Sequence, residues 1–476
     1  MHSMYKECNP TPALSPKMLL FNEDLANEIN LHHLIENSNE RLDILSGNKL
    51  IKDSKPIAFA YSGHQFGHFN PNLGDGRALL LGEILDQQGK LKDIQLKGSG
   101  RTPFSRRGDG KSALGPVLRE YLISESMHIL GIPTTRSLAA INTGEKVHRD
   151  EETYGGIMTR VASSHIRIGS FEYAFKNKDI SVVKDLADYS ISRHYPDTAR
   201  LDNPYLAFFA AVCNEQASLV ASWMTVGFIH GVMNTDNMAI SGETIDYGPC
   251  AFMDAYDPAT VFSSIDVNGR YAYGNQPAIL TWNLTRLAET LIPLVNKDKD
   301  ESIKLLTEVL QLIKPVYTNY WLSLMRSKIG LSKEEQNDIE LITNLLEIME
   351  EEKADFTNSF RLLSKALIGD TQSIRKLFNN SRRFDGWIMV WQERISQEGV
   401  DEEKIASSMD KVNPIYIPRN HKVEEALKSS VFNNDMEPFT KLYSVLQNPY
   451  HEIIGLESFA EPAPESTIPY RTFCGT

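Results

Sequence analysis

The sequence predicts an α+β fold with two lobes, a strand-rich N-terminal lobe and a helical C-terminal lobe that carries a helical extension. Three observations lead to this prediction. Short apolar runs separated by Gly, Asn and Asp fill residues 56–100, one amphipathic helical pattern follows at 112–131, and long helical patterns dominate from residue 205 onward. A length of 476 residues, at roughly 150 residues per domain, also suggests two or three structural units.

The strands of the N-terminal lobe are predicted from apolar runs bounded by turn residues, as in an antiparallel meander followed by two further strands. These runs are 56–61, 77–85, 92–97, 136–141 and 156–162. Among them, residues 112–131 place apolar side chains on one face with a helical period. We expect Ser112 to be the N-cap of this helix and Gly131 to end it.

The C-terminal lobe is predicted to begin with a long apolar helix at 205–229, which leads directly into the segment HGVMNTDN. Residues 237–246 are then expected to form a strand, a tight turn and a second strand, because Ser-Gly-Glu lies in the middle. Further helical patterns occupy 277–295, 301–314, 333–350 and 355–368. A Pro-rich stretch from residue 457 predicts an extended tail.

These patterns divide the chain into four segments. No internal repeat or low-complexity tract interrupts their order in the sequence. The segments are an irregular N-terminal segment at 1–55, the N-terminal lobe at 56–165, the helical lobe with its catalytic hairpin and extension at 166–456, and the tail at 457–476.

Charge and composition narrow the classes of function. The net charge of −13, from 62 acidic and 49 basic residues, opposes binding to a phosphate backbone, so we expect no nucleic-acid partner. No run of 18 apolar residues and no export-signal pattern occur in the sequence, which predicts a cytoplasmic protein with no membrane partner. The cysteines are too widely spaced for a zinc site or a disulfide-built fold. They are Cys8, Cys213, Cys250 and Cys474.

Two features next to predicted strands suit the phosphates of a nucleotide. Gly74 and Gly76 lie one residue apart before Arg77, so backbone amides can approach a phosphate closely, although an ordinary hairpin turn also explains this pattern. Lys97 ends a predicted strand, and Glu120 follows in the predicted helix. Kinases use such a lysine and glutamate pair to fix a phosphate-binding ammonium group, whereas the alternative is two solvated surface charges.

A second glycine-rich segment, 98–111, is dense in glycine and basic residues, which favours contact with a polyphosphate over a merely flexible solvated loop. Within it, Asp109 and Gly110 can reach a ribose or a base rather than a phosphate. Arg160 and Arg167 lie seven residues apart across a polar turn, so they can converge on one anion.

The strongest pattern is the segment from His230 to Asn237, followed by Asp246 in the tripeptide D-Y-G. Protein kinases use H-R-D-x-x-x-x-N followed by D-F-G, in which the first Asp orients the acceptor hydroxyl and the Asn and second Asp hold Mg²⁺. Asn237 and Asp246 match the metal ligands, but Val232 occupies the position of the kinase base. A valine cannot accept a proton, and the nearest carboxylate is that of Asp236.

This spacing predicts a kinase-like fold in which the oxygens of Asn237 and Asp246 bind Mg²⁺ or Mn²⁺ and Asp236 accepts the proton of a hydroxyl group. The alternative is a helix-to-strand loop whose Asp and Asn residues only form turns. His64 and His68 have a spacing that suits zinc on a helix, but the glycines around them make a helix unfavourable, so we interpret them as loop residues.

Several long segments resemble selenoprotein O and its bacterial relatives, and the resemblance spans roughly residues 56–476. The segments are YSGHQFGHFNPNLGDGRALLLGEI, QLKGSGRTPFSRRGDGKSALGPVLREYLISE, HGVMNTDNMAISGETIDYGPCAFMDAYDP and NPIYIPRNH. The resemblance implies a kinase-like fold and transfer of AMP from ATP to Ser, Thr or Tyr hydroxyls of other proteins. It also implies a nucleotide that is flipped relative to that of a protein kinase, so that its α-phosphate faces the acceptor.

The resemblance implies roles for residues that the patterns above already single out. Glu120 would pair with Lys97, Asn237 and Asp246 would hold the metal ion, and Asp236 would accept the proton. The implied nucleotide-binding residues are Gly74, Gly76, Arg77, Lys97, Asp109, Gly110, Arg160, Arg167 and Asp246. Cys474 matches the C-terminal selenocysteine or cysteine of the family, but Phe262 stands where some relatives carry its disulfide partner.

Three alternatives to AMP transfer follow from the same residues. A kinase-type phosphotransferase is disfavoured by Val232, and a non-catalytic nucleotide-binding scaffold is disfavoured by the intact set of Asp236, Asn237 and Asp246. Transfer of UMP from UTP with Mn²⁺ would use the same residues as AMP transfer.

Overall fold

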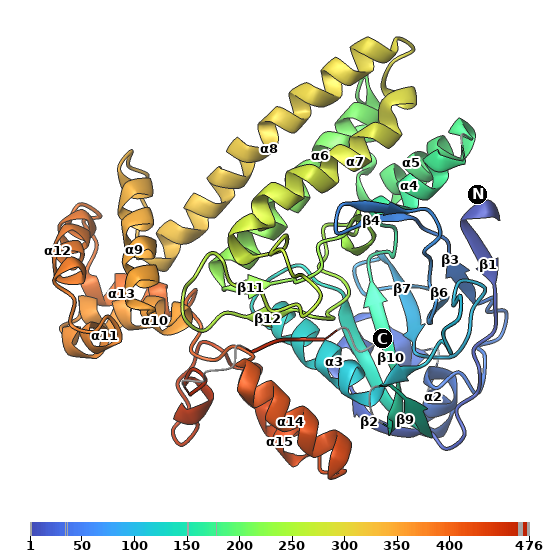
Figure 1. The fold of residues 1–476 in the computed structure, drawn as a ribbon, viewed down its shortest axis with the longest axis horizontal. Coiled ribbons are helices and arrows are strands. Elements are labelled where there is room, and N and C mark those ends of the chain that lie inside the picture. The colour runs from blue at the N-terminus through green and yellow to red at the C-terminus, as the bar shows by residue number, and fades with distance from the viewer. Residues whose placement is uncertain are drawn as a thin grey trace.

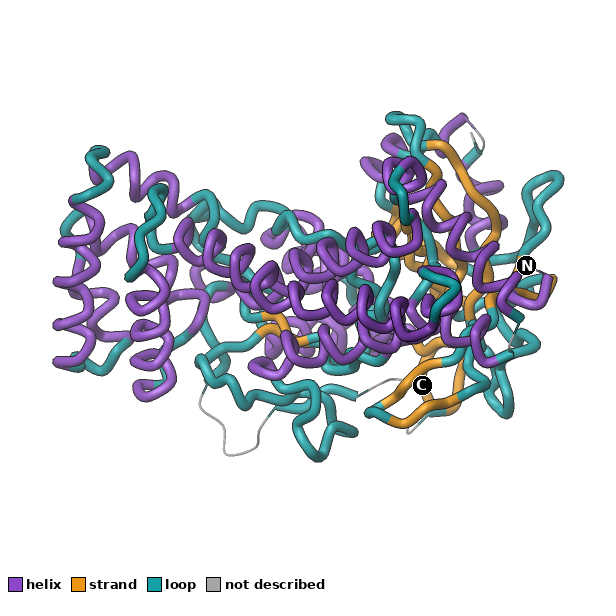
Figure 2. Tube along the Cα trace, turned by 90° about the horizontal axis from the view of Figure 1, so that it is seen from above, coloured by secondary structure: helices purple, strands orange, loops and turns teal. Residues whose placement is uncertain are grey.

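The computed structural model describes residues 2–33, 35, 37–149, 152–177, 179–464 and 470–473. It shows a mixed α+β protein with a sheet-rich N-terminal part and a helical C-terminal part. Figure 1 shows the strands gathered on one side of the molecule, with long helices leading away from them to a group of shorter helices at the opposite end. Figure 2 shows the same separation from above.

The main sheet has the strand order β1-β3-β6-β7-β10-β9-β2, and each neighbouring pair is antiparallel. Its strands are β1 (Tyr5–Glu7), β2 (Lys17–Phe21), β3 (Ile57–Phe59), β6 (Ala78–Leu85), β7 (Leu91–Lys97), β9 (Arg136–His148) and β10 (Glu152–Ala162), and β8 (Ser112–Ala113) pairs with β10. The predicted strands are confirmed. The two edge strands from the N-terminal segment were not expected, because runs of three and five residues carry little periodicity.

Helix α3 (Leu114–Ile129) packs between the sheet and α14 (Asn420–Phe432), and most of its side chains are buried. The predicted N-cap was wrong. Ala113 occupies the cap position without a side-chain hydrogen bond, because Ser112 is drawn into β8 opposite Gly156. The other face of the sheet is covered by α1 (Glu23–Glu28) and α2 (Ser38–Leu45), which complete a second apolar core.

The helical part is built around three long helices, α6 (Pro204–Thr225), α7 (Gln276–Val295) and α8 (Lys299–Lys328). Helix α8 runs through Pro315, where the sequence pattern ends the helix at residue 314. Because α8 packs along both α6 and α7, this packing outweighs the one backbone hydrogen bond that proline removes. Two shorter helices, α4 (Ile168–Lys176) and α5 (Ile180–His194), connect the sheet to this group.

The extension consists of shorter helices that share one apolar core with α3 and the long helices. They are α9 (Asp338–Glu352), α10 (Phe356–Leu367), α11 (Thr371–Leu377), α12 (Arg382–Ser396), α13 (Glu402–Asp410), α14 and α15 (Glu437–Leu446). Across the described ranges, no helix is long and apolar enough to cross a membrane.

The hairpin predicted at 237–246 was wrong. A turn bond from the Gly242 N–H to Ala239 O at 3.1 Å is present, but the flanking residues pair with other segments: the Ile240 N–H donates to Ile166 O at 2.9 Å, and the Thr244 N–H donates to Pro133 O at 2.9 Å. The segment is thereby fixed between the two parts of the molecule. It begins with a short 3-10 helix, η4 (Thr235–Asn237), and it is flanked by the small pair β11 (Phe228–Ile229) and β12 (Ala251–Phe252).

Candidate active site

A cluster of charged side chains joins the sheet, α3 and the D-Y-G segment. The Lys97 ammonium at the end of β7 donates to Glu120 at 2.6 Å and to Asp246 at 2.9 Å. Arg160 from β10 donates to the same two carboxylates, at 2.6 Å for Asp246, and Arg167 donates to the second oxygen of Asp246 at 2.6 Å. Both Asp246 oxygens are therefore held by cations.

The electrostatic balance of this cluster keeps both carboxylates ionised. Burial by itself raises the pKa of Asp246, but the charges of Arg160, Lys97 and Arg167 hold that pKa well below its usual range. Burial likewise opposes ionisation of Glu120, and Arg160 and Lys97 lower its pKa. The sequence-level alternative of a solvated Lys97 and Glu120 is excluded, because both side chains are largely buried.

Asp246 has a backbone φ of +63°, in the left-handed region that side chains other than glycine rarely adopt. Such a conformation costs on the order of 1 kcal/mol and persists only where the surroundings enforce it. Here the three cations hold the carboxylate in place. Strain of this kind is concentrated at functional sites.

Asp236 is buried beside this cluster, and one of its carboxylate oxygens is enclosed without a hydrogen-bond partner among the described residues. Its Oδ2 accepts a hydrogen bond from Gln65 Nε2 at 3.1 Å, and its backbone oxygen accepts from Arg167 at 2.7 Å. Its Oδ1 has no hydrogen-bond partner within the described part of the chain. Burial raises the pKa of Asp236 to about 7, although Arg167 and Gln65 oppose that rise. A hydroxyl group that reached Oδ1 would find a carboxylate suited to accept its proton.

The two glycine-rich segments pack against each other at the edge of the cluster. Gly74 has a φ of +123°, and a Cβ at this position would lie 2.7 Å from the Phe104 ring. Gly110 has a φ of +71°, and a Cβ there would lie 2.1 Å from Gly100 O. Both positions therefore require glycine, and at these two positions the backbone lines the edge of the charged cluster.

One cavity of about 960 Å³ brings the predicted residues together. Asp109 lies at its exposed edge, where it pairs with Arg149 at 3.0 Å. The predicted residues that line the cavity are Gly74, Gly76, Arg77, Lys97, Asp109, Gly110, Arg160, Arg167, Asp236, Asn237 and Asp246. The volume is that of a small-molecule site, and its lining combines cations, flexible backbone and two acidic residues at the centre.

Comparison with known proteins identifies the family. A family model described as Protein adenylyltransferase SelO matches residues 2–447. The chain belongs to the SelO family. Proteins named Protein nucleotidyltransferase YdiU are similar to it along nearly the whole length. The one from Maridesulfovibrio salexigens is 51% identical over 472 residues, covering 99% of this chain and 96% of the relative. One from Cereibacter sphaeroides is 52% identical over 479 residues, covering 100% and 98%, and that from Agrobacterium fabrum is 48% identical over 467 residues, covering 98% and 96%.

The family is one of nucleotidyltransferase enzymes, and the cavity of this SelO member suits a metal–nucleotide complex. Asn237 donates its amide N–H to Val232 O at 2.9 Å, which leaves its side-chain oxygen as a hard ligand beside Asp246. No cluster of three or more His, Cys, Asp or Glu side chains among the described residues could hold a metal ion alone. The donor set therefore fits a divalent ion such as Mg²⁺ that arrives with nucleotide phosphates and takes its remaining ligands from them.

Several residues that contact this SelO cluster were missed by the sequence patterns. Gln65 holds Asp236, Tyr61 places its ring 4.8 Å from the Arg167 guanidinium, and buried Asp75 lies 4.0 Å from Arg167. Tyr61 and Gln65 come from the segment around β4 (Gly63–Gln65) and β5 (His68–Asn70), a hairpin separate from the main sheet. No periodicity marks them, because their side chains face the site rather than an apolar core.

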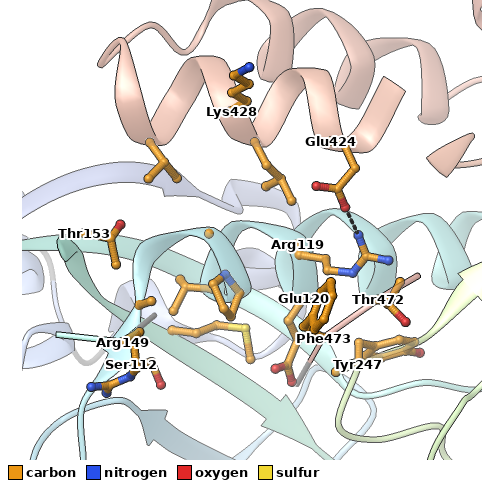
Figure 3. A pocket seen from close by; sticks show the side chains of 18 of the residues that line it. Ser112, Arg119, Glu120, Arg149, Thr153, Tyr247, Glu424, Lys428, Thr472 and Phe473 are labelled. Carbon is orange, nitrogen blue, oxygen red and sulfur yellow. Dashed lines mark hydrogen bonds and ion pairs between the residues drawn. The ribbon is translucent and has the colours of Figure 1, made fainter. Parts of the chain in front are cut away.

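A second cavity of about 740 Å³ adjoins the first between α3 and α14 and shares Lys97 and Arg77 with it. Figure 3 shows Glu120 and Phe473 at its floor, and Arg119 reaching toward Glu424 on α14. Arg119 donates to Glu424 at 3.2 Å and to Cys250 O at 2.6 Å. Arg119 and Glu120 are both buried, which excludes the alternative in which Glu120 is a solvated surface residue.

The chain near its C-terminal end lies against the segment that follows the D-Y-G tripeptide. The Thr472 N–H donates to Phe262 O at 2.8 Å, and its hydroxyl donates to Pro249 O at 2.7 Å. Phe262 packs edge-on against Tyr470, with ring centroids 5.8 Å apart. Cys474 lies outside the described residues.

Proposed function

We propose that this SelO-family protein transfers AMP from ATP to Ser, Thr or Tyr hydroxyl groups of other proteins, with Mg²⁺ or Mn²⁺ bound by Asn237 and Asp246. One observation carries the proposal. Asp236 lines the same cavity as the Lys97, Arg160 and Arg167 cations and has a carboxylate oxygen without a hydrogen-bond partner among the described residues, whereas Val232 occupies the kinase base position. The names of the family and of its relatives support nucleotidyl transfer, and the two-part α+β layout is compatible with a kinase-like fold.

The proposed reaction is an in-line displacement at the α-phosphorus. The Asp236 carboxylate takes the proton of the acceptor hydroxyl, and the hydroxyl oxygen forms a bond to the α-phosphorus. The bond between that phosphorus and the oxygen bridging to the β-phosphorus breaks, and diphosphate leaves with the bond electrons. Lys97, Arg160 and Arg167 neutralise the charge that develops on the departing diphosphate. A bound divalent ion would add positive charge at the phosphate oxygens.

Phosphate binding and metal binding are coupled in this scheme. In the structure, both oxygens of Asp246 accept hydrogen bonds from cations. Phosphate oxygens attract the same cations and thereby free the carboxylate as a ligand. We expect nucleotide and metal ion to strengthen each other's binding for this reason.

The test uses ATP labelled on the α- or the γ-phosphate, incubated with the protein and Mg²⁺. We expect the α-label, and not the γ-label, to enter protein. Entry of γ-label alone would instead identify a kinase-type phosphotransferase, and no entry with tight nucleotide binding would identify a scaffold. Labelled UTP with Mn²⁺, run in parallel, shows which nucleotide is transferred.

The variant Asp236→Asn tests the proton acceptor. We expect it to bind ATP normally and to transfer label at least a hundredfold more slowly, within the range for loss of a general base. Asp197→Asn, an exposed position in the 3-10 helix Pro196–Arg200, is the matched control. Normal turnover by Asp236→Asn would remove this residue as the base.

A further inference from the structure

The surface next to Asp236 carries a cation that the cavity chemistry does not use. Arg270 lies beside the β4–β5 hairpin, where its guanidinium carbon would be 3.6 Å from a Cβ built on Gly67. On its other side the guanidinium covers the Trp282 ring of α7, with 4.6 Å between its carbon and the ring centroid. This sandwich holds the side chain in one place, with its charge beside the site.

No carboxylate among the described residues forms an ion pair with Arg270, in a chain whose net charge is −13. The nearest comparable arginine, Arg286, also lies over Trp282, at 5.0 Å, but pairs with Glu289 at 2.9 Å. Burial and the charges of Arg286 and Arg270 lower the pKa of His64, although Glu289 opposes that shift, and the His64 ring meets Trp282 edge-on at 5.3 Å. Arg286 is thus paired with a carboxylate, whereas Arg270 has no ion-pair partner among the described residues.

Short contacts connect Arg270 to the proton acceptor. The next residue, Tyr271, donates its hydroxyl to Asn234 Oδ1 at 2.6 Å, two residues before Asp236. The Phe66 N–H donates to that same Asn234 oxygen at 3.1 Å, and the preceding residue, Gln65, holds Asp236 Oδ2. The hairpin and the Arg270 loop thus brace the loop that presents Asp236.

Apolar side chains complete this surface. Ile265 lines the Asp236 cavity and is 52% exposed, and Val267 in the same loop is 86% exposed. Phe69 of β5 is 44% exposed and packs against His64, with ring centroids 5.0 Å apart. Apolar contacts around one uncompensated charge are the usual make-up of a polypeptide-binding surface.

We propose that the acceptor-docking surface, formed by Phe69, Ile265, Arg270 and Trp282, binds polypeptide segments that carry Asp or Glu beside the reacting hydroxyl. The proposal rests on the proposed function, because it names the class of acceptor for the same site. A carboxylate on the acceptor would pair with the Arg270 guanidinium while the hydroxyl reaches the Asp236 carboxylate. The same charge pair would offset repulsion between an acidic acceptor and this acidic protein.

The test uses three peptide pools with a fixed central serine and randomised flanks. The flanks contain Asp and Glu in the first pool, Asn and Gln in the second, and Lys and Arg in the third. For the wild-type protein, we expect α-label to enter the acidic pool with a kcat/KM about fivefold above that of the amide pool, the scale of one partly exposed charge pair. The preference should lie in KM, since Arg270 does not contact the nucleotide cavity.

Charge reversal separates recognition from loss of folding. Arg270→Glu should reverse the order and favour the Lys and Arg pool, a gain that a misfolded variant would not show. Its affinity for ATP should stay within about twofold of the wild type. Arg200→Glu makes the same charge change at an exposed position outside the cavity and should keep the wild-type order. An unchanged acidic preference in Arg270→Glu would overturn the proposal.

A binding assay tests the docking surface separately from transfer. It follows the anisotropy of the fluorescein-labelled acidic pool with ATP and EDTA present. Weaker binding by Arg270→Glu than by Arg200→Glu supports the docking surface even if no label enters any peptide, in which case only the proposed AMP transfer fails. Equal binding by both variants rejects the docking surface even if transfer occurs.

Discussion

Replacing Asp246 by asparagine tests how the charge cluster is balanced. The change leaves Lys97, Arg160 and Arg167 with Glu120 as the remaining carboxylate that contacts Lys97 and Arg160. Removing one partner from a fully buried ion pair typically costs about 3–5 kcal/mol, and the Asp246 side chain is 22% exposed. Partial exposure reduces the cost, so we expect the free energy of unfolding to fall by about 2–3 kcal/mol.

The same variant, Asp246→Asn, should respond more strongly to phosphates than the wild type does. Without Mg²⁺, in EDTA, ATP supplies the negative charge that the substituted amide lacks, so metal-free ATP should bind more tightly and restore more stability than in the wild type. The added affinity that Mg²⁺ gives the wild type should disappear. Urea unfolding with and without ATP, together with calorimetric titration of ATP, measures both effects.

Asp338 provides the matched control for this experiment. It is a buried carboxylate in the extension that accepts from Arg326 at 2.7 Å and from Arg394 at 2.8 Å. Asp338→Asn should also lose stability, but ATP should not recover it, because this pair lies outside the nucleotide cavity. If Asp246→Asn were as stable as the wild type, or if ATP stabilised both variants equally, the charge-replacement reasoning would be wrong.

Three further predictions follow from individual contacts. Gln65→Ala should slow transfer about tenfold with unchanged ATP affinity, because it frees the carboxylate of Asp236 to rotate. Gln65→Asn, with a shorter side chain, should restore little of the lost rate. Steady-state kinetics and a titration of ATP binding check both variants. Gly74→Ala should weaken ATP binding at least tenfold, since its Cβ would collide with Phe104 at a positive φ, and wild-type affinity in a titration would refute this. Lys328 is fully buried, and burial lowers its pKa to about 7. Between that pH and about 10.5 the unfolded chain therefore binds more protons than the folded protein. The free energy of unfolding of the wild type should rise with pH over this range. Lys328→Met should therefore be more stable than the wild type by about 1–4 kcal/mol at pH 7, and urea unfolding should show the difference shrinking toward pH 10.

The predicted strands and the helix at 112–131 are found because each buries one face, and that burial imposes a period on the sequence. The edge strands at Tyr5–Glu7 and Lys17–Phe21 are too short to show such a period. The segment at 237–246 looks like a hairpin because Gly242 forms a turn with Ala239, but the backbone N–H groups of Ile240 and Thr244 donate to Ile166 and Pro133. Pairing between segments distant in the sequence leaves no local signal.

The candidate site was predictable to the extent that chemistry restricts residue type. Glycine at positive φ, carboxylates beside a metal position and clustered arginines are recognisable from the letters alone. Gln65 and Arg270 are not, because a glutamine or an arginine in a loop is ordinary until its neighbours are known. Their significance comes from contact with Asp236 in one case and, within the described residues, from a missing carboxylate partner in the other.

The depth at which α3 is held has a consequence for control. Regulated protein kinases switch by swinging a helix so that its glutamate leaves a strand lysine. Here Leu118 and Leu122 are completely enclosed, and moving the helix outward would expose them, at about 1.5–3 kcal/mol for each side chain, before the loss of contacts with α14 is counted. The cost of moving α3 therefore keeps the ion pair between Glu120 and Lys97 formed. We therefore expect any on–off control to act on access by the nucleotide or the acceptor rather than on the position of α3.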